Sequence, residues 1–163
     1  QGDKAIIDIL AAMGAQLKLD ELNLAVTSSL TATKATIIDA ANCPDIIPVL
    51  AVLAAVSEGT TEIINAGRLR IKECDRLQAV TTELGKLGAD ITELTDGLII
   101  KGRQFLTGGE VECWNDHRIA MSLAIASCKC QSEVVVHGAE SVRKSYPKFW
   151  EDFAALGGQI AKV

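Results

Sequence analysis

An internal repeat of about seventy residues constrains the fold of this chain more than any other feature of its sequence. Three helical patterns end in nearly the same letters, LAAMGAQL, LGKLGADI and FAALGGQI, with central glycines Gly14, Gly88 and Gly157. A second correspondence, between PDIIPVLAVLAAVSEGTTEIINAG and NDHRIAMSLAIASCKCQSEVVVHG, has nearly the same offset. The repeat predicts a fold built from similar units.

The spacing of apolar residues changes along one unit and predicts its elements. ATIIDA is typical of a buried strand, residues 46–56 of an apolar helix, and TEIINA of a second strand. Residues 75–87 predict an amphipathic helix with Leu77, Val80, Leu84 and Leu87 facing inward. ADITEL and GLIIKG, joined by the turn TDG, predict a hairpin. One unit therefore has the order βαβαββ.

We expect an α/β fold in which repeated βαβαββ units pack around shared helices, all within a single domain spanning residues 1–163. Residues 1–30 would be the end of an incomplete first unit, 31–105 the second unit, and 106–163 a third unit that lacks only its last strand. The opening QGDKAII has no initiator Met, so we also expect a chain cut at its start.

Composition excludes several classes of partner. The formal net charge of −5 leaves no basic excess for a general nucleic-acid surface. The apolar run IIPVLAVLAAV is too short to span a bilayer and contains Pro48. The five cysteines are odd in number and lack paired C-x-x-C spacing, so we expect thiols in the core, no metal or other cofactor, and a reducing cytoplasm.

Cations gather at three predicted helix starts, where the helix dipole disfavours them unless an anion is present. Lys72 and Arg76 bracket one start, His117 and Arg118 open another after the letters ND, and Lys144 precedes a third. Free N–H groups together with cationic side chains suit a phosphate or a carboxylate. This placement predicts an anionic ligand.

Each of these positions also has a purely structural interpretation. Glu73 and Arg76, three residues apart, are by themselves more typical of a surface ion pair. Asp45 and Asp116 can be N-caps, and His117 can be a capping or packing residue. The basic turn around residue 144 can simply be solvated. Recurrence at matching places in the repeat favours the ligand site.

The runs LRIKECDRL, NDHRIAMSLAIAS and VRKSYPKFWEDFAALGG, with the opening QGD and AAMGA, resemble the 5-enolpyruvylshikimate-3-phosphate (EPSP) synthase family of the shikimate pathway, which glyphosate inhibits. The resemblance covers essentially the whole chain. It implies most of one enolpyruvate transferase lobe, an inside-out α/β barrel, and a missing N-terminal lobe as the partner. Cys74 stands where the family usually has Thr or Ser, and Arg68 where it often has Asn or Glu.

The family moves the carboxyvinyl group of phosphoenolpyruvate to the 5-hydroxyl of shikimate 3-phosphate and releases phosphate, a step of aromatic amino acid biosynthesis. The resemblance implies that Asp45 binds the shikimate hydroxyls and acts as base, that Lys72 lies near the same oxygen, and that Glu73 handles the proton at C3. It implies a second group that binds substrate: Arg76 and Arg118 at the phosphoenolpyruvate carboxylate, Lys144 at a phosphate, and His117 as a hydrogen-bonding neighbour.

Two other readings remain open at this point. The related transferase that acts on UDP-N-acetylglucosamine shares the fold and the donor, although the Lys-Glu-x-Asp-Arg and Asn-Asp-His-Arg runs favour the shikimate enzyme. The chain can also be a noncatalytic isolated lobe. We expect no measurable turnover from this chain alone, because half of the cations that hold the substrates would lie on the missing lobe.

Overall fold

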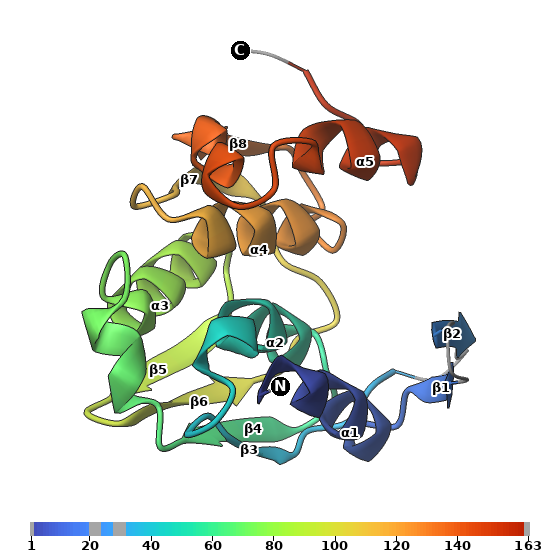
Figure 1. Ribbon diagram of the computed structural model, residues 1–163, viewed down its shortest axis with the longest axis vertical. Coiled ribbons are helices and arrows are strands. Elements are labelled where there is room, and N and C mark those ends of the chain that lie inside the picture. Colours follow the sequence, from blue (N-terminus) through green and yellow to red (C-terminus); the bar gives the residue numbers. More distant parts are fainter. Residues whose placement is uncertain (1, 20–23, 28–31, 162–163) are drawn as a thin grey trace.

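The computed structural model describes residues 2–19, 24–27 and 32–161 (Figure 1). At the N-terminal end a helix leads into a two-stranded antiparallel hairpin, the helix–strand–strand order expected for the end of a unit. These elements are η1 (Gly2–Lys4), α1 (Ala5–Ala12), β1 (Gln16–Leu19) and β2 (Leu24–Thr27).

The middle of the chain forms one complete βαβαββ unit, which confirms the predicted order. Its sheet has the strand order β3-β4-β6-β5, with β3 and β4 parallel and the other pairs antiparallel. Leu94 pairs with Gly97, so the predicted hairpin turn lies at residues 95–96. The elements are β3 (Ile37–Asp39), η2 (Pro44–Ile46), α2 (Ile47–Ala55), β4 (Thr60–Ile64), η3 (Gly67–Ile71), α3 (Arg76–Lys86), β5 (Asp90–Leu94) and β6 (Gly97–Lys101).

The core lies between this sheet and the helices. Side chains alternate across β4, so that Thr61 and Ile63 are buried while Thr60, Glu62 and Ile64 are exposed. The four predicted inward positions, three on α3 and Leu87 at its C-cap, are all buried, because residues three and four apart share one helix face. The core therefore joins the sheet to α2 and α3.

The C-terminal part repeats the first four elements of the unit, βαβα, with a parallel pair of strands, β7 and β8. Because the third unit is expected to lack only its last strand, one strand should follow α5. Residues 158–161 form no strand, which contradicts this expectation for that stretch, and residues 162–163 lie outside the described part. A small aromatic cluster of Phe149, Trp150 and Phe153 packs α5 onto α4. The elements are β7 (Gly109–Glu112), α4 (His117–Ser127), β8 (Val134–His137), η4 (Ala139–Lys144) and α5 (Phe149–Ala155).

Helices α2, α3 and α4 pack against one another in the interior, with α4 above α2 in Figure 1. Residues at or just before their starts contact each other, so the three helices begin at one place. None of the helices that the structure describes has the length and apolarity to cross a bilayer. All five cysteines are unpaired, and Cys43 and Cys113 are buried as predicted, whereas Cys128 is exposed.

Candidate functional site

Arg76 is the centre of the site. Arg76 is fully buried at the first position of α3. This excludes the interpretation of Glu73 and Arg76 as a surface ion pair. Its guanidinium donates to three carboxylates: Nε to Asp116 at 2.8 Å, Nη1 to Asp45 at 2.8 Å and Nη2 to Glu73 at 2.6 Å. Nη2 also lies 3.3 Å from the second oxygen of Asp116. A planar fork of donors suits this arrangement better than an ammonium group would.

Asp116 does two jobs in the structure. Its Oδ1 accepts from the backbone N–H of Arg118 at 2.8 Å, so it is the N-cap of α4, and the same carboxylate holds Arg76. Its side chain is completely buried. Burial raises the pKa of the Asp116 carboxyl, but the hydrogen bond and charge of Arg76 outweigh burial, and the net pKa lies below the ordinary value. Asp116 is therefore a buried carboxylate paired with a buried cation.

Asp45, the repeat partner of Asp116, has a different job. It lies within η2 and makes no capping bond, so the N-cap interpretation is wrong for this residue. Its carboxylate contacts Lys72 Nζ at 3.1 Å, Arg76 Nη1 at 2.8 Å and Arg118 Nη2 at 3.3 Å. Partial burial raises its pKa, but the hydrogen bond from Lys72 and the charge of Arg118 lower it by more. A carboxylate ringed by three cations stays ionised.

The exposed edge of the cluster carries Lys72 and Glu73. Lys72 follows η3, and the side chains of Lys72 and Glu73 are 26% and 41% exposed, so both can meet a ligand. Cys74 points inward, with its thiol 3.6 Å from Asp116. Burial and the neighbouring carboxylate raise the pKa of the Cys74 thiol to about 12. The thiol therefore stays protonated beside Asp116.

Arg70 anchors this segment to the β5–β6 hairpin. Its guanidinium donates to the backbone oxygens of Leu94 and Thr95 at 2.7 and 3.1 Å and to the carboxylate of Glu93 at 2.7 Å. It also donates at 2.9 Å to Asp75, which caps α3 through Gln78 N. The sequence placed Arg70 among the charges of LRIKECDRL but assigned it no role. Its contacts join the hairpin to the N-cap of α3 and include neither Asp45 nor Arg76.

The remaining predicted residues lie around the start of α4. Arg118 donates Nη1 to the backbone oxygen of Asp45 at 3.1 Å, which ties α4 to the segment before α2. His117 is buried, and its Nδ1 has no hydrogen-bond partner among the described residues. Lys144 ends η4 and is exposed, and its Nζ donates to the backbone oxygen of Asn115. The structure thus places Lys144 beside the start of α4 rather than in contact with Asp45.

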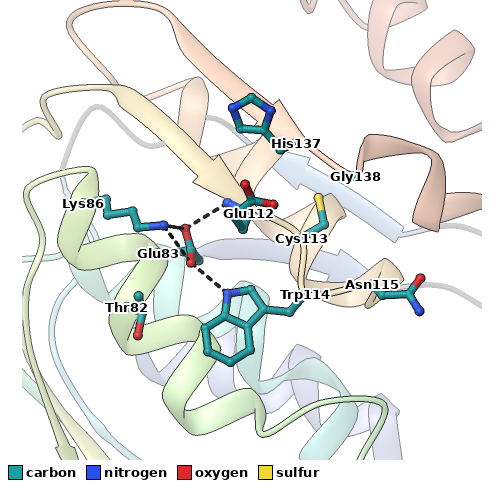
Figure 2. Close-up of a pocket in the computed structure, with 9 residues that line it drawn as sticks. All are labelled: Thr82, Glu83, Lys86, Glu112, Cys113, Trp114, Asn115, His137 and Gly138. Atoms are coloured by element: carbon teal, nitrogen blue, oxygen red, sulfur yellow. Dashed lines mark hydrogen bonds and ion pairs between the residues drawn. The ribbon is translucent and has the colours of Figure 1, made fainter.

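Two hollows flank this cluster. One, of about 200 Å³, opens between α2 and α4, and its lining includes the side chains of Asp45 and Arg118. The other, of about 420 Å³, lies behind the turn that leads into α4, between the last turns of α3 and the ends of β7 and β8 (Figure 2). Of these two hollows, only the first is lined by members of the charged cluster, Asp45 and Arg118.

The arrangement brings six of the seven predicted residues to one end of three helices, with Lys144 at the edge. Three of its cationic side chains, those of Lys72, Arg118 and Lys144, keep exposed surface toward solvent, where an anion can reach them. Such a surface can bind an anion with carboxylate or phosphate groups while an ionised Asp45 accepts a hydrogen bond from a hydroxyl. Sequence reasoning missed Asp116 as a partner of Arg76; only its match to Asp45 in the repeat pointed to it.

Comparisons with known proteins show which family the chain resembles. The family described as EPSP synthase (3-phosphoshikimate 1-carboxyvinyltransferase) matches residues 1–153. The chain is 61% identical over 159 residues to a 3-phosphoshikimate 1-carboxyvinyltransferase of Clostridium perfringens, and 59% identical over 160 residues to one of Clostridium novyi. These alignments cover 97% and 98% of this chain but only 37% and 36% of the relatives.

A solved structure extends the likeness to three dimensions. An EPSP synthase from Acinetobacter baumannii superposes with a TM-score of 0.91 at 31% identity, over 98% of this chain and 40% of that one. The likeness agrees with the enolpyruvate transferase fold expected from the repeat. By the match of its sequence over nearly its full length and by its fold, the chain belongs to the EPSP synthase family.

Proposed function

We propose that this chain is part of an enolpyruvyl transferase that moves the carboxyvinyl group of phosphoenolpyruvate to the 5-hydroxyl of shikimate 3-phosphate. The observation that carries the proposal is the contact of one aspartate, Asp45, with three cations from two helix starts and the segment before α3. The substrates carry a hydroxyl close to a carboxylate and a phosphate. An ionised protein carboxylate can bind the hydroxyl, and solvent-exposed cationic side chains beside it can bind the two anionic groups.

The roles that the resemblance implies for Asp45, Lys72 and Glu73 are compatible with their positions in the cluster. Asp45 would accept the proton of the 5-hydroxyl while the hydroxyl oxygen bonds to C2 of phosphoenolpyruvate. Lys72, whose Nζ is 3.1 Å from the Asp45 carboxylate, would lie near that hydroxyl oxygen. Glu73, the most exposed carboxylate on Arg76, would deliver the proton to C3 and remove it when phosphate leaves C2. One group acting as acid and then as base suits addition followed by elimination.

The cations would bind the phosphoenolpyruvate. In the ligand-free structure the outer nitrogens of Arg76 are taken by Asp45 and Glu73, so a substrate carboxylate would have to replace part of these contacts. Arg118 would bind the same carboxylate, because its side chain is 30% exposed beside Asp45. Lys144 would contact a phosphate. His117 would form a hydrogen bond with a neighbouring group of the site.

The chain spans less than two fifths of the curated relatives that it matches, and this supports a second statement. We propose that residues 1–163 form one domain of three units, at about 1–30, 31–105 and 106–163, and that a second lobe supplies the other substrate contacts. Isolated, the chain would bind ligands weakly and would not turn over, since an open site leaves its charges in water. A cytoplasmic location remains a prediction from the unpaired cysteines.

Ligand-observed phosphorus NMR of the purified chain tests the proposal. We expect the phosphorus signals of shikimate 3-phosphate and phosphoenolpyruvate to broaden at millimolar concentration, and UDP-N-acetylglucosamine to show no effect. Equal broadening for all three would indicate nonspecific attraction to cations and would contradict the proposed specificity. In a parallel assay, phosphate release from the two substrates should be undetectable; measurable release would overturn the statement that the chain is inactive alone.

A further inference from the structure

The turn that leads into α4 has an unusual backbone. Trp114 and Asn115 both have positive φ, at 52° each, and the N–H of Asp116 closes the turn on the oxygen of Cys113 at 2.9 Å. Asn tolerates this region of the backbone map, but a bulky residue such as Trp rarely adopts it. Such a conformation persists only where the surrounding contacts enforce it, and it occurs most often at functional sites.

A buried carboxylate on α3 supplies contacts that enforce this turn. Glu83 is 1% exposed, and its two oxygens accept from the indole Nε1 of Trp114 at 2.8 Å and from the backbone N–H of Glu112 at 2.9 Å (Figure 2). The same carboxylate accepts from Lys86 Nζ at 3.0 and 2.8 Å. A buried carboxylate with several charge-assisted bonds is a rigid anchor, because leaving any partner unpaired is unfavourable.

The turn delivers two groups to the charged cluster. The backbone oxygen of Asn115 accepts from Lys144, and the next residue, Asp116, caps α4 and holds Arg76 through two contacts. A change in the dihedral angles of Trp114 or Asn115 would therefore turn this carbonyl and this carboxylate away from two of the proposed ligand-binding cations.

We propose that Glu83 is a positioning residue for the anion site: it holds the left-handed Trp114–Asn115 turn, and the turn fixes Lys144 and Arg76. This inference rests on the proposed function for its role in binding. Glu83 lies in the wall of the 420 Å³ hollow, behind the turn, and touches none of the residues proposed to contact substrate. Its influence would reach the ligand only through the backbone of residues 112–116.

Four variants of the purified chain test the role of Glu83. Glu83→Gln keeps the size of the side chain and removes its charge. Trp114→Phe keeps an aromatic ring but removes the indole N–H donor together with the second ring. Lys86→Gln is the matched control: it removes the cation that pairs with Glu83, but an amide can still donate to the same carboxylate, and the hydrogen bonds from Trp114 and Glu112 stay in place. Trp114→Phe combined with Asn115→Gly is the rescue, since glycine adopts positive φ without strain.

The readouts are the Nε–H resonance of Arg76, the urea midpoint, and the dissociation constant for phosphoenolpyruvate. We expect Glu83→Gln and Trp114→Phe to shift the Arg76 resonance without ligand and to weaken phosphoenolpyruvate binding by roughly tenfold, the equivalent of one charge-assisted hydrogen bond. Lys86→Gln should change neither the Arg76 resonance nor the affinity for phosphoenolpyruvate. The double variant with Asn115→Gly should recover most of the affinity that Trp114→Phe loses. For Trp114→Phe the loss of affinity should exceed what the fall in the urea midpoint accounts for, which separates positioning from general destabilisation.

An unchanged Arg76 resonance and unchanged affinity in Trp114→Phe would overturn the inference. The same holds if the affinity falls only in step with the urea midpoint. If Glu83→Gln does not fold, Trp114→Phe and its rescue decide the question. If the unmodified chain fails to bind phosphoenolpyruvate, the proposed function fails, whereas the Arg76 resonance still decides whether Glu83 positions the turn.

Discussion

Arg76 and Asp116 form a two-point contact in the interior, with Nε to Oδ2 at 2.8 Å and Nη2 to Oδ1 at 3.3 Å, and both side chains have at most 1% of their surface exposed. They come from adjacent helices and are forty positions apart in sequence. The contact fixes the start of α3 against the start of α4. It therefore sets the relative positions of Glu73 and Arg118, the proposed ligand contacts on either side.

Replacing Asp116 with Asn should destabilise the chain strongly. The change leaves a buried guanidinium without its one fully buried counter-charge, and breaking a buried pair in this way costs about 3 to 5 kcal/mol. Urea unfolding followed by circular dichroism measures the free energy. Glu73→Gln is the control, because Glu73 pairs with the same Arg76 but is 41% exposed, and it should lose less than about 1 kcal/mol. Equal losses of unfolding free energy in the two variants would show that the burial of the Arg76–Asp116 pair does not determine its contribution to stability.

Stability should fall in acid through the same cluster. The folded-state pKa values of Asp45 and Asp116 lie below the ordinary value, so their contribution is present above the unfolded pKa of about 4 and is lost as pH falls through the folded values. Urea midpoints between pH 6 and pH 3 should decline most steeply below about pH 4. Asp45→Asn should flatten this decline; an equally steep decline in that variant would remove Asp45 from the explanation.

The cysteines should differ sharply in reactivity. Burial raises the pKa of the Cys74 and Cys113 thiols to about 12, so almost no thiolate forms at pH 8. Cys128 is exposed at the end of α4. Iodoacetamide at pH 8 should label Cys128 at least tenfold faster than Cys74, as read by peptide mass spectrometry, since the thiolate is the reactive form. Equal labelling rates would mean that the Cys74 thiol is not held beside Asp116.

Arg70→Ala should loosen the segment that carries Lys72 and Glu73. The change removes the contacts of Arg70 with residues 93–95 and with Asp75, and a loss of about 1 to 3 kcal/mol is expected for charge-assisted bonds of this kind. Amide exchange of residues 67–75 should accelerate. The matched control is Arg103→Ala, which removes a single exposed pair with Asp90 at 3.5 Å and should leave that exchange unchanged. Acceleration in both variants would contradict a specific anchor.

Much of the fold could be predicted from the sequence because it rests on local patterns. The βαβαββ order follows from the spacing of apolar residues, and the hairpin at residues 95–96 from its turn letters. The strand expected after α5 is absent from residues 158–161, since an apolar pattern alone does not supply a pairing partner. The residues of that stretch make no ladder with β7 or β8, which pair only with each other among the described strands.

The site was harder to predict, because its decisive contacts join distant parts of the chain. The charges of LRIKECDRL were visible, but only packing of α3 on α4 could show that Arg76 is buried and held by Asp116. Glu83 carried a readable signal: it lies three residues after Val80 and four before Leu87, both inward-facing, so its helical position is a buried one. The left-handed turn at Trp114 had no signal in the sequence, because Trp does not favour positive φ.

The most direct test of the central claim is a protein-observed NMR titration of the chain with shikimate 3-phosphate followed by phosphoenolpyruvate. We expect saturable shifts, with a dissociation constant in the millimolar range, in the amides and side chains of a defined set: Asp45, Lys72, Glu73, Arg76, His117, Arg118 and Lys144. Saturable shifts at other residues would contradict the proposed site. The absence of shifts up to about 10 mM of either ligand would also contradict it, because binding would then be weaker than roughly −3 kcal/mol.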